Sequence, residues 1–297
     1  MSQASATHQP GPFSPDFGWP APAKLNLFLH VTGRRADGYH SLQTLFQFLD
    51  LADHIYFRPR GDGQIRLLSP LPDIPPETDL VYRAAQRLQQ RSGVAIGAEI
   101  RVDKRIPLGA GLGGGSSNAA TTLVALNRIW DLCLTPDELA SIGLELGADV
   151  PVFVRGQAAW AEGVGERLAP VTLPEPWYVL LLPPVQVATG PIFAAPELRR
   201  DHPRITLADY QAGHAGNDCE PVTCARFPAV AAALDWLRGH GPARMSGTGA
   251  CVFLDTGSGE HGERRAREIA ARAPAEHRSV VARGLNQSAL AAIMRGL

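Results

Sequence analysis

Apolar residues recur at every second position near the start of the chain, between Ala23 and Val31, with Lys24, Asn26, Phe28 and His30 between them. The apolar residues of this segment fall on every second position: Leu25, Leu27, Leu29 and Val31. A period of two residues places them on one face of a β-strand. The other face carries Lys24 and Asn26, so we expect a half-buried strand that starts near Pro22 and presents polar groups.

Helix and strand patterns follow one another over residues 80–103. Apolar residues at positions 80, 81, 84, 85 and 88 recur at the spacing of one helix face. The alternation from 98 to 102 predicts a strand, and this strand delivers the chain to Pro107.

A capping box starts another helix further along the chain. Thr135 is followed three residues later by Glu138, with Pro136 at the first helical position, which predicts a helix over 136–146. The apolar run at 150–154 predicts a strand behind it. Asp149 is therefore expected on a short connection from helix to strand, where functional residues are common.

A glycine-rich loop carries the clearest functional signal. Five of the seven residues from Gly109 to Gly115 are glycine, and a helix-forming stretch rich in hydroxyl groups follows. Glycine permits φ > 0 and leaves backbone N–H groups open to a ligand. The start of a helix adds unpaired N–H groups and the positive end of its dipole, which favour a phosphate. The loop therefore predicts a nucleotide-binding site.

Two other kinds of nucleotide-binding loop have similar sequence motifs. The Gly-x-Gly-x-x-Gly fingerprint of dinucleotide-binding proteins is matched by Gly109, Gly111 and Gly114. That fingerprint needs an acidic residue after a second strand, and no strand separates the loop from Asp131. A P-loop must end in Gly-Lys-Ser/Thr, whereas Gly115 is followed by Ser116. An NAD-dependent oxidoreductase and a non-catalytic nucleotide-binding module remain alternatives.

The composition excludes several other classes of protein. A formal net charge of −1 over 297 residues argues against a nucleic-acid-binding surface, which would need a strongly basic stripe. No apolar run reaches the roughly 18 residues needed to cross a bilayer, and the first 20 residues lack the apolar core of a secretion signal. Four scattered cysteines indicate reduced thiols. We expect a cytoplasmic protein with a small-molecule partner, no nucleic acid and no membrane; the oligomeric state is left undefined.

Proline and glycine divide the chain into three predicted parts. Residues 1–20 contain four prolines and two glycines and predict a flexible arm. Glycine, proline and charged residues dominate again over 163–176, which predicts a break between domains. We expect one domain over 21–165 and a second over 166–297.

Three separated motifs together resemble the GHMP kinases. They are the strand start Lys24-x-Asn26, the glycine loop over 107–120 and a second glycine loop over 245–253. The resemblance implies a two-domain α+β fold. Its N-terminal domain binds the nucleotide and has a left-handed βαβ unit like that of ribosomal proteins, and its C-terminal domain is a ferredoxin-like α/β sandwich. The active site is expected in the cleft between them.

Further motifs resemble one subgroup of that family. They are Pro-Ala-Lys-Leu-Asn-Leu at 22–27, Arg-Ala-Asp-Gly-Tyr-His at 35–40, Leu-Gly-Ala-Asp-Val-Pro at 146–151 and Ala-Glu-Gly-Val-Gly-Glu at 161–166. This resemblance implies that ATP, with Mg²⁺, phosphorylates the 2-hydroxyl of a methylerythritol linked to cytidine diphosphate, a step of the non-mevalonate route to isoprenoid precursors. Mevalonate, homoserine or a sugar, the substrates of other family members, are the alternatives.

The resemblance also implies roles for individual residues. Asp149 would be the general base and Lys24 would stabilise charge at the reaction centre. The substrate would contact Asn26, Tyr39, His40 and Phe193, the last three at its cytosine. The ATP phosphates would be held by Pro107, Leu108, Gly109, Ala110, Gly111, Leu112, Gly113, Gly114, Gly115, Ser116 and Ser117. The metal ligands are not identified, and the hydroxyls of Ser116 and Ser117 are candidates.

Overall fold

The computed structural model describes residues 11, 14–36, 38–69 and 75–295. Its strands are β1 (Trp19–Arg34), β2 (His40–Arg60), β3 (Ile65–Leu67), β4 (Gly97–Asp103), β5 (Ala159–Gly163), β6 (Arg167–Pro170), β7 (Trp177–Leu182), β8 (Arg244–Met245), β9 (Val252–Asp255) and β10 (Arg278–Leu285). Its α-helices are α1 (Leu80–Ser92), α2 (Gly114–Ile129), α3 (Pro136–Leu146), α4 (Val150–Arg155), α5 (Thr189–Phe193), α6 (Leu207–Gln211), α7 (Glu220–Arg226), α8 (Pro228–Arg238), α9 (Gly259–Ala270) and α10 (Ala289–Arg295), and a 3₁₀ turn, η1, covers Pro76–Thr78.

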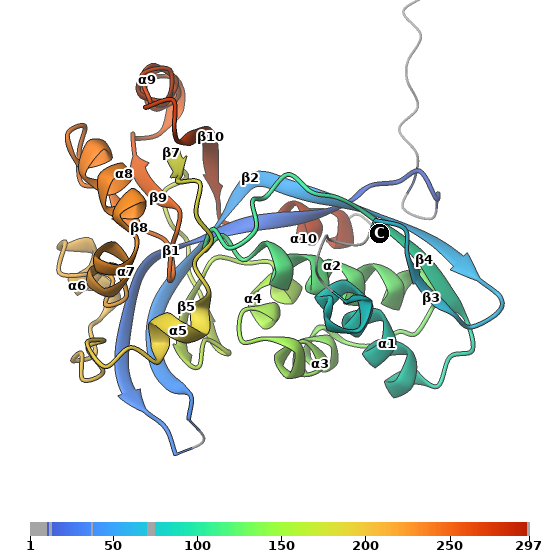
Figure 1. The fold of residues 1–297 in the computed structure, drawn as a ribbon. Helices are drawn as coiled ribbons and strands as arrows, with labels where there is room; N and C mark the ends of the chain where they lie inside the picture. Colours follow the sequence, from blue (N-terminus) through green and yellow to red (C-terminus); the bar gives the residue numbers. More distant parts are fainter. Residues whose placement is uncertain (1–10, 12–13, 37, 70–74, 296–297) are drawn as a thin grey trace, which may run out of the picture.

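Two long antiparallel strands, β1 and β2, run through the whole molecule (Figure 1). At one end β2 pairs with β4, and β3 continues the sheet beyond it. Near its middle β2 meets β10, which leads through β7 and β9 to β8, and the first part of β2 pairs with β5. The two halves of the molecule therefore share one sheet, and the same two strands pass from one half into the other.

Helices cover each half separately. Helices α1 to α4 gather beside β1, β2 and β4, while α8 and α9 lie against β7 and β9 (Figure 1). The first group packs around one apolar core and the second around another, and a third core lies between them at the middle of β1. None of the helices in the described parts of the chain is long and apolar enough to cross a membrane.

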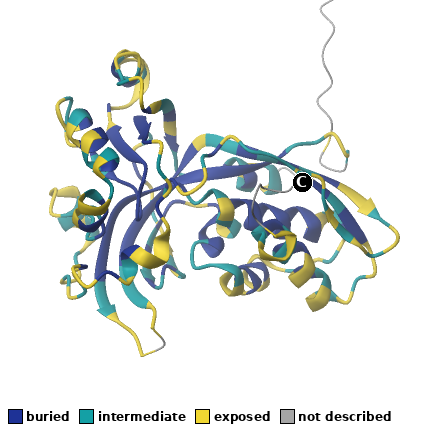
Figure 2. Ribbon diagram, viewed as in Figure 1, coloured by how far each residue is buried: buried dark blue, intermediate teal, exposed yellow. Residues whose placement is uncertain are grey.

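Strand β1 differs from the expected half-buried strand in being buried on both faces (Figure 2). Lys24 and Asn26, on the face expected to be open, are each only 3% exposed. The reason is long-range: the glycine loop and Asp149 cover Lys24, and the loop at Ser246 covers Asn26, which the alternation alone does not reveal. The strand also starts at Trp19 rather than near Pro22.

Several local predictions are confirmed. Helix α1 and strand β4 form where the patterns place them, and the Asp79 carboxylate caps α1 by accepting a bond from the N–H of Val81 at 2.7 Å. Helix α3 spans 136–146 as predicted, with both bonds of the capping box between Thr135 and Glu138.

The predicted strand at 150–154 is wrong, because this segment is helix α4. Pro151 lies in its first turn, and Gly156 ends it with a left-handed conformation. The short run is apolar throughout because α4 is packed against α2 and α3, and such a run has no period that separates a buried strand from a buried helix. Asp149 consequently lies just before a helix.

The chain returns to the first half at its end. Strand β10 pairs with β2 as well as β7, and Leu290 of α10 lies in the core of the first half. The division at residue 165 stays a prediction. Of the predicted arm, residues 1–10 and 12–13 lie outside the described residues, and Trp19 and Pro20 belong to β1.

Candidate active site

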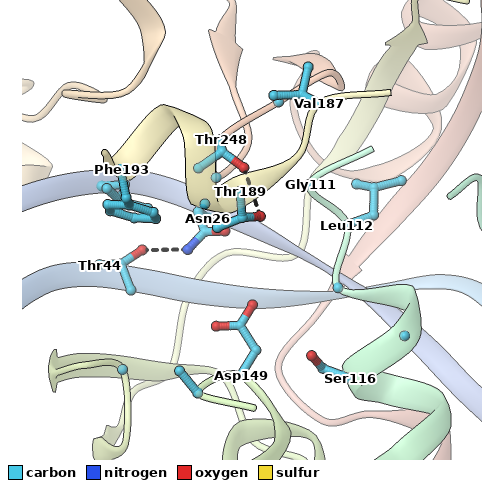
Figure 3. A pocket seen from close by; sticks show the side chains of 18 of the residues that line it. Asn26, Thr44, Gly111, Leu112, Ser116, Asp149, Val187, Thr189, Phe193 and Thr248 are labelled. Carbon is cyan, nitrogen blue, oxygen red and sulfur yellow. Dashed lines mark hydrogen bonds between the residues drawn. The ribbon is translucent and has the colours of Figure 1, made fainter. Parts of the chain in front are cut away.

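A cavity of about 720 Å³ lies where the two halves meet. Its walls come from β1, the first part of β2, the glycine loop, the turn before α4, and the segments around α5 and the second glycine loop. Figure 3 shows the Asp149 carboxylate on one side of this space and Phe193, Thr189 and Thr248 on the other. Groups distant in sequence therefore face one shared volume.

The glycine loop forms one wall of the cavity. Gly109, Gly111 and Gly113 have φ values of 64°, 71° and 72°, a region that residues other than glycine rarely adopt. Helix α2 begins at Gly114, so its free N–H groups open toward the same wall. Residue 110 is not among those with positive φ, which explains why an alanine fits there.

The loop is fixed from behind by the second glycine loop. Cys251 donates its N–H to the carbonyl of Ala110 at 3.0 Å, and the Ser246 hydroxyl donates to the carbonyl of Gly111 at 2.9 Å. Leu112 is buried in the third core, and its carbonyl accepts the N–H of Lys24 at 3.0 Å. The predicted second loop thus supports the first one, and it also contributes residues 247–249 to the cavity wall.

Lys24 and Asp149 form an ion pair inside the cavity, with 3.2 Å between the ammonium nitrogen and Oδ2. The lysine side chain is 4% exposed, and the aspartate side chain is 32% exposed. Asp149 precedes α4 without capping it, so its carboxylate is available on the cavity side. The pair presents one buried cation and one accessible base to the same space.

Asn26 links this ion pair to the neighbouring strand. Its Oδ1 accepts a bond from the Lys24 ammonium, and its Nδ2 donates to the Thr44 hydroxyl at 2.9 Å (Figure 3). Its backbone N–H donates to the Ser246 hydroxyl at 3.1 Å. Asn26 therefore holds the lysine in place while itself lining the cavity.

The far end of the cavity is aromatic. The rings of His40 and Phe193 stack with centroids 5.3 Å apart and an interplanar angle of 27°, and Tyr39 is 62% exposed at the rim. Burial lowers the pKa of His40, and the nearby charges of Arg200 and Arg34 lower it further. The ring is therefore neutral at pH 7, with one nitrogen that donates and one that accepts.

Sequence reasoning missed Lys104. This lysine lines the main cavity and a smaller adjoining one of about 170 Å³, which also includes Asp79 and Leu108. It is ion-paired with Asp53, a fully buried carboxylate that also accepts bonds from the N–H groups of residues 105 and 106. Its position at the end of β4, just before Pro107 and the glycine loop, could have indicated that it lies near the nucleotide site.

The predicted site residues fall together with one exception. All of them line the cavity except Ser117, which is buried and whose hydroxyl has no hydrogen-bond partner among the described residues. Ser116, by contrast, faces the cavity beside Asp149 (Figure 3). Within the described residues, no group of three or more histidine, cysteine or acidic residues is arranged to hold a metal.

Known proteins resemble this chain over most of its length. The model of the GHMP kinases N terminal domain matches residues 79–157, and that of the GHMP kinases C terminal domain matches residues 194–275. A 4-diphosphocytidyl-2-C-methyl-D-erythritol kinase of Nitrosococcus oceani is 56% identical over 272 residues, which cover 92% of this chain and 96% of that protein. The enzyme of the same name from Dechloromonas aromatica is 53% identical over 276 residues, 93% of this chain and 99% of that protein.

Solved structures agree with the sequence comparisons. A crystal structure of 4-(cytidine 5'-diphospho)-2C-methyl-D-erythritol kinase is 34% identical and superposes with a TM-score of 0.76, covering 90% of this chain and 99% of that one. A mevalonate kinase is 16% identical with a TM-score of 0.65, over 92% of this chain and 100% of that one, and shows the fold alone. The expected two-domain α+β fold is confirmed. The chain belongs to the GHMP kinase family of ATP-dependent small-molecule kinases.

Proposed function

We propose that this protein transfers the γ-phosphoryl group of ATP to the 2-hydroxyl of 4-diphosphocytidyl-2-C-methyl-D-erythritol. The observation that carries the proposal is the order of groups along one cavity. The glycine loop lies at one end, the pair of Lys24 and Asp149 in the middle, and the rings of His40 and Phe193 at the other end. A substrate with a base at one end and a reactive hydroxyl at the other fits this order.

Asp149 is the general base of the proposed reaction. Its carboxylate takes the proton of the 2-hydroxyl while that oxygen bonds to the γ-phosphorus and the bond from phosphorus to the ADP oxygen breaks. The Lys24 ammonium, 3.2 Å from Asp149, stabilises the negative charge that gathers at the reacting oxygens. Asn26 orients Lys24 for this role through its bond to the ammonium.

The glycine loop binds the phosphates of ATP in this proposal. Backbone N–H groups around the three glycines of positive φ and the free N–H groups of α2 supply donors without side chains in the way. The adjoining small cavity beside Lys104 extends the site for the rest of the nucleotide.

Mg²⁺ fits this site as a partner of ATP rather than as an ion in a protein cage. The ion usually takes one or two protein oxygens together with substrate phosphates and water, and the Ser116 hydroxyl at the start of α2 is a suitable oxygen. Bound there, Mg²⁺ would neutralise charge on the phosphates. Ser117 does not line the cavity and is the weaker candidate of the two.

Turnover of three candidate substrates tests the proposed function. In a coupled assay of ADP release, we expect activity with 4-diphosphocytidyl-2-C-methyl-D-erythritol and none above background with mevalonate or homoserine. Faster turnover of either of the latter would contradict the proposed substrate. Tight binding of NAD without binding of ATP would favour the oxidoreductase alternative instead.

Replacing Tyr39 with alanine is expected to weaken binding of the cytidine substrate. Stacking of an aromatic ring on a base contributes roughly 1–3 kcal/mol, so the KM for this substrate should rise about 5- to 150-fold, with the KM for ATP unchanged. Steady-state kinetics measures both constants. Tyr56→Ala is the matched control, because Tyr56 stacks on Arg101 outside the cavity. An unchanged KM for the cytidine substrate in Tyr39→Ala would exclude the stacking role.

A further inference from the structure

Arg200 connects the two aromatic residues at the far end of the cavity. Its Nη2 donates to the carbonyl of Phe193 at 3.0 Å and to that of Ala195 at 2.6 Å, and its Nη1 donates to the carbonyl of Leu198 at 3.0 Å. These bonds hold the guanidinium in one orientation at the end of α5. A fourth donor, the N–H of Nε, points to His40, and Nε lies 3.1 Å from the Nε2 of His40.

This contact determines which nitrogen of His40 carries the proton. A guanidinium has five N–H donors and no acceptor, so the Nε2 of His40 must accept. In a neutral imidazole the other nitrogen then carries the hydrogen, which makes Nδ1–H a donor. The ring is neutral because burial, with Arg200 and Arg34 nearby, lowers the pKa of His40.

The orientation of the ring is fixed as well. His40 is stacked against Phe193, whose carbonyl is bound by the same guanidinium. Arg200 therefore holds both the ring and the residue on which it stacks, and both line the cavity. Among the hydrogen bonds of the described residues, the one from Arg200 is the only one made by the His40 ring, so Nδ1–H is left for a ligand.

We propose that Arg200 is a positioning residue that makes the site selective for cytosine over uracil, by fixing His40 as a hydrogen-bond donor toward the base. This inference rests on the proposed function. Cytosine has an acceptor at N3, and a fixed Nδ1–H donor can bond to it. Uracil has N3–H at the same place, so two donors would face each other. If the His40 ring could change tautomer, its Nδ1 could become an acceptor and bind the N3–H of uracil. A fixed tautomer prevents this and so penalises uracil more strongly.

Base selectivity of the Arg200→Met variant tests this role. Methionine preserves much of the side-chain length and removes every donor. We expect the preference for the cytidine over the uridine form of the substrate, measured as the ratio of kcat/KM values, to fall about ten- to a hundredfold, the range for one unmatched buried hydrogen bond. The loss should lie in KM for the cytidine substrate, with kcat and the KM for ATP nearly unchanged. A residue that only stabilised α5 would leave the ratio unchanged, which would overturn the proposal.

Arg199→Met is the matched control. Arg199 is the neighbouring residue, its side chain is half exposed, and its ion pair is with the exposed Asp201. We expect wild-type selectivity in this variant. If Arg199→Met lost as much selectivity as Arg200→Met, the effect would come from a general disturbance of the segment around residues 199 and 200. The contact between Arg200 and His40 would then not be its cause.

Nitrogen NMR of the wild-type protein tests the tautomer without any substrate. With ¹⁵N-labelled histidine at neutral pH, the His40 ring is expected to show the Nδ1–H form. The Nε2–H form would overturn the inference, even if Arg200→Met fails to fold. Failure of the proposed function would look different: the wild-type protein would not turn over the cytidine substrate, whatever the tautomer of His40.

Discussion

Asp149→Asn is expected to lower kcat by about a hundred- to ten-thousandfold, the usual contribution of a general base. Asparagine keeps the shape of the side chain but cannot take the proton of the 2-hydroxyl. The affinity for ATP should hardly change, because the glycine loop is formed by other segments and is fixed from behind by the loop at 245–251. Single-turnover kinetics gives the rate, and calorimetry with a non-hydrolysable ATP analogue gives the affinity.

Asp137→Asn provides the control for this experiment. Asp137 lies on α3, its side chain is 79% exposed, and it is paired with Arg155 outside the cavity. We expect wild-type kinetics from it. A kcat for Asp149→Asn equal to that of the control would remove Asp149 from the role of base and leave it as the partner of Lys24.

Gly111→Ala is expected to abolish ATP binding while the rest of the protein remains folded. The added methyl group would collide with the carbonyl oxygen of Ser246 and lie 2.9 Å from that of Gly249. Both obstacles are backbone atoms, so no side-chain rotation relieves the clash. The residue would also occupy a left-handed conformation with φ of 71°, which disfavours a Cβ atom by roughly 1–2 kcal/mol. The glycine loop must then move away from the loop at 245–251. Its backbone N–H groups would no longer point together at the phosphates of ATP.

Gly93→Ala separates the steric clash of the added methyl group from the penalty of the left-handed conformation. Gly93 has φ of 70° at the end of α1, and a methyl group there would meet nothing within 4 Å. It should show only the conformational penalty, as a slightly lower melting temperature with normal ATP binding. If calorimetry found ATP binding in Gly111→Ala as strong as in Gly93→Ala, the close contact between the two loops would not be needed for the nucleotide site.

The features that the sequence predicted well are local ones. The bonds that start α3 join residues three positions apart, and the glycines that shape the nucleotide loop impose their conformation within a few residues. Chemistry of this kind is readable because the interacting groups are neighbours in the chain. The glycine loop and α3 could therefore be placed before any tertiary contact was known.

Tertiary packing accounts for what the sequence did not reveal. Nothing in the pattern around Lys24 announces that Asp149, 125 positions later, is its partner, and only the family resemblance suggested the pairing. The residues at 150–154 of α4 are apolar on all sides because neighbouring helices surround them, so the segment lacks the alternation of apolar and polar positions that would identify a helix. Arg200 had no sequence signal, because its importance depends on the position of His40, 160 residues earlier.

The return of the chain to its first half has a consequence for synthesis on the ribosome. Most of the first core comes from residues up to Ala161, but Leu290 belongs to it, and α10 lies against β1. A ribosome adds this helix long after the residues that it covers. The nascent chain therefore keeps an apolar face of its first half uncovered until the second half has been made, and the two halves cannot complete their folding one after the other.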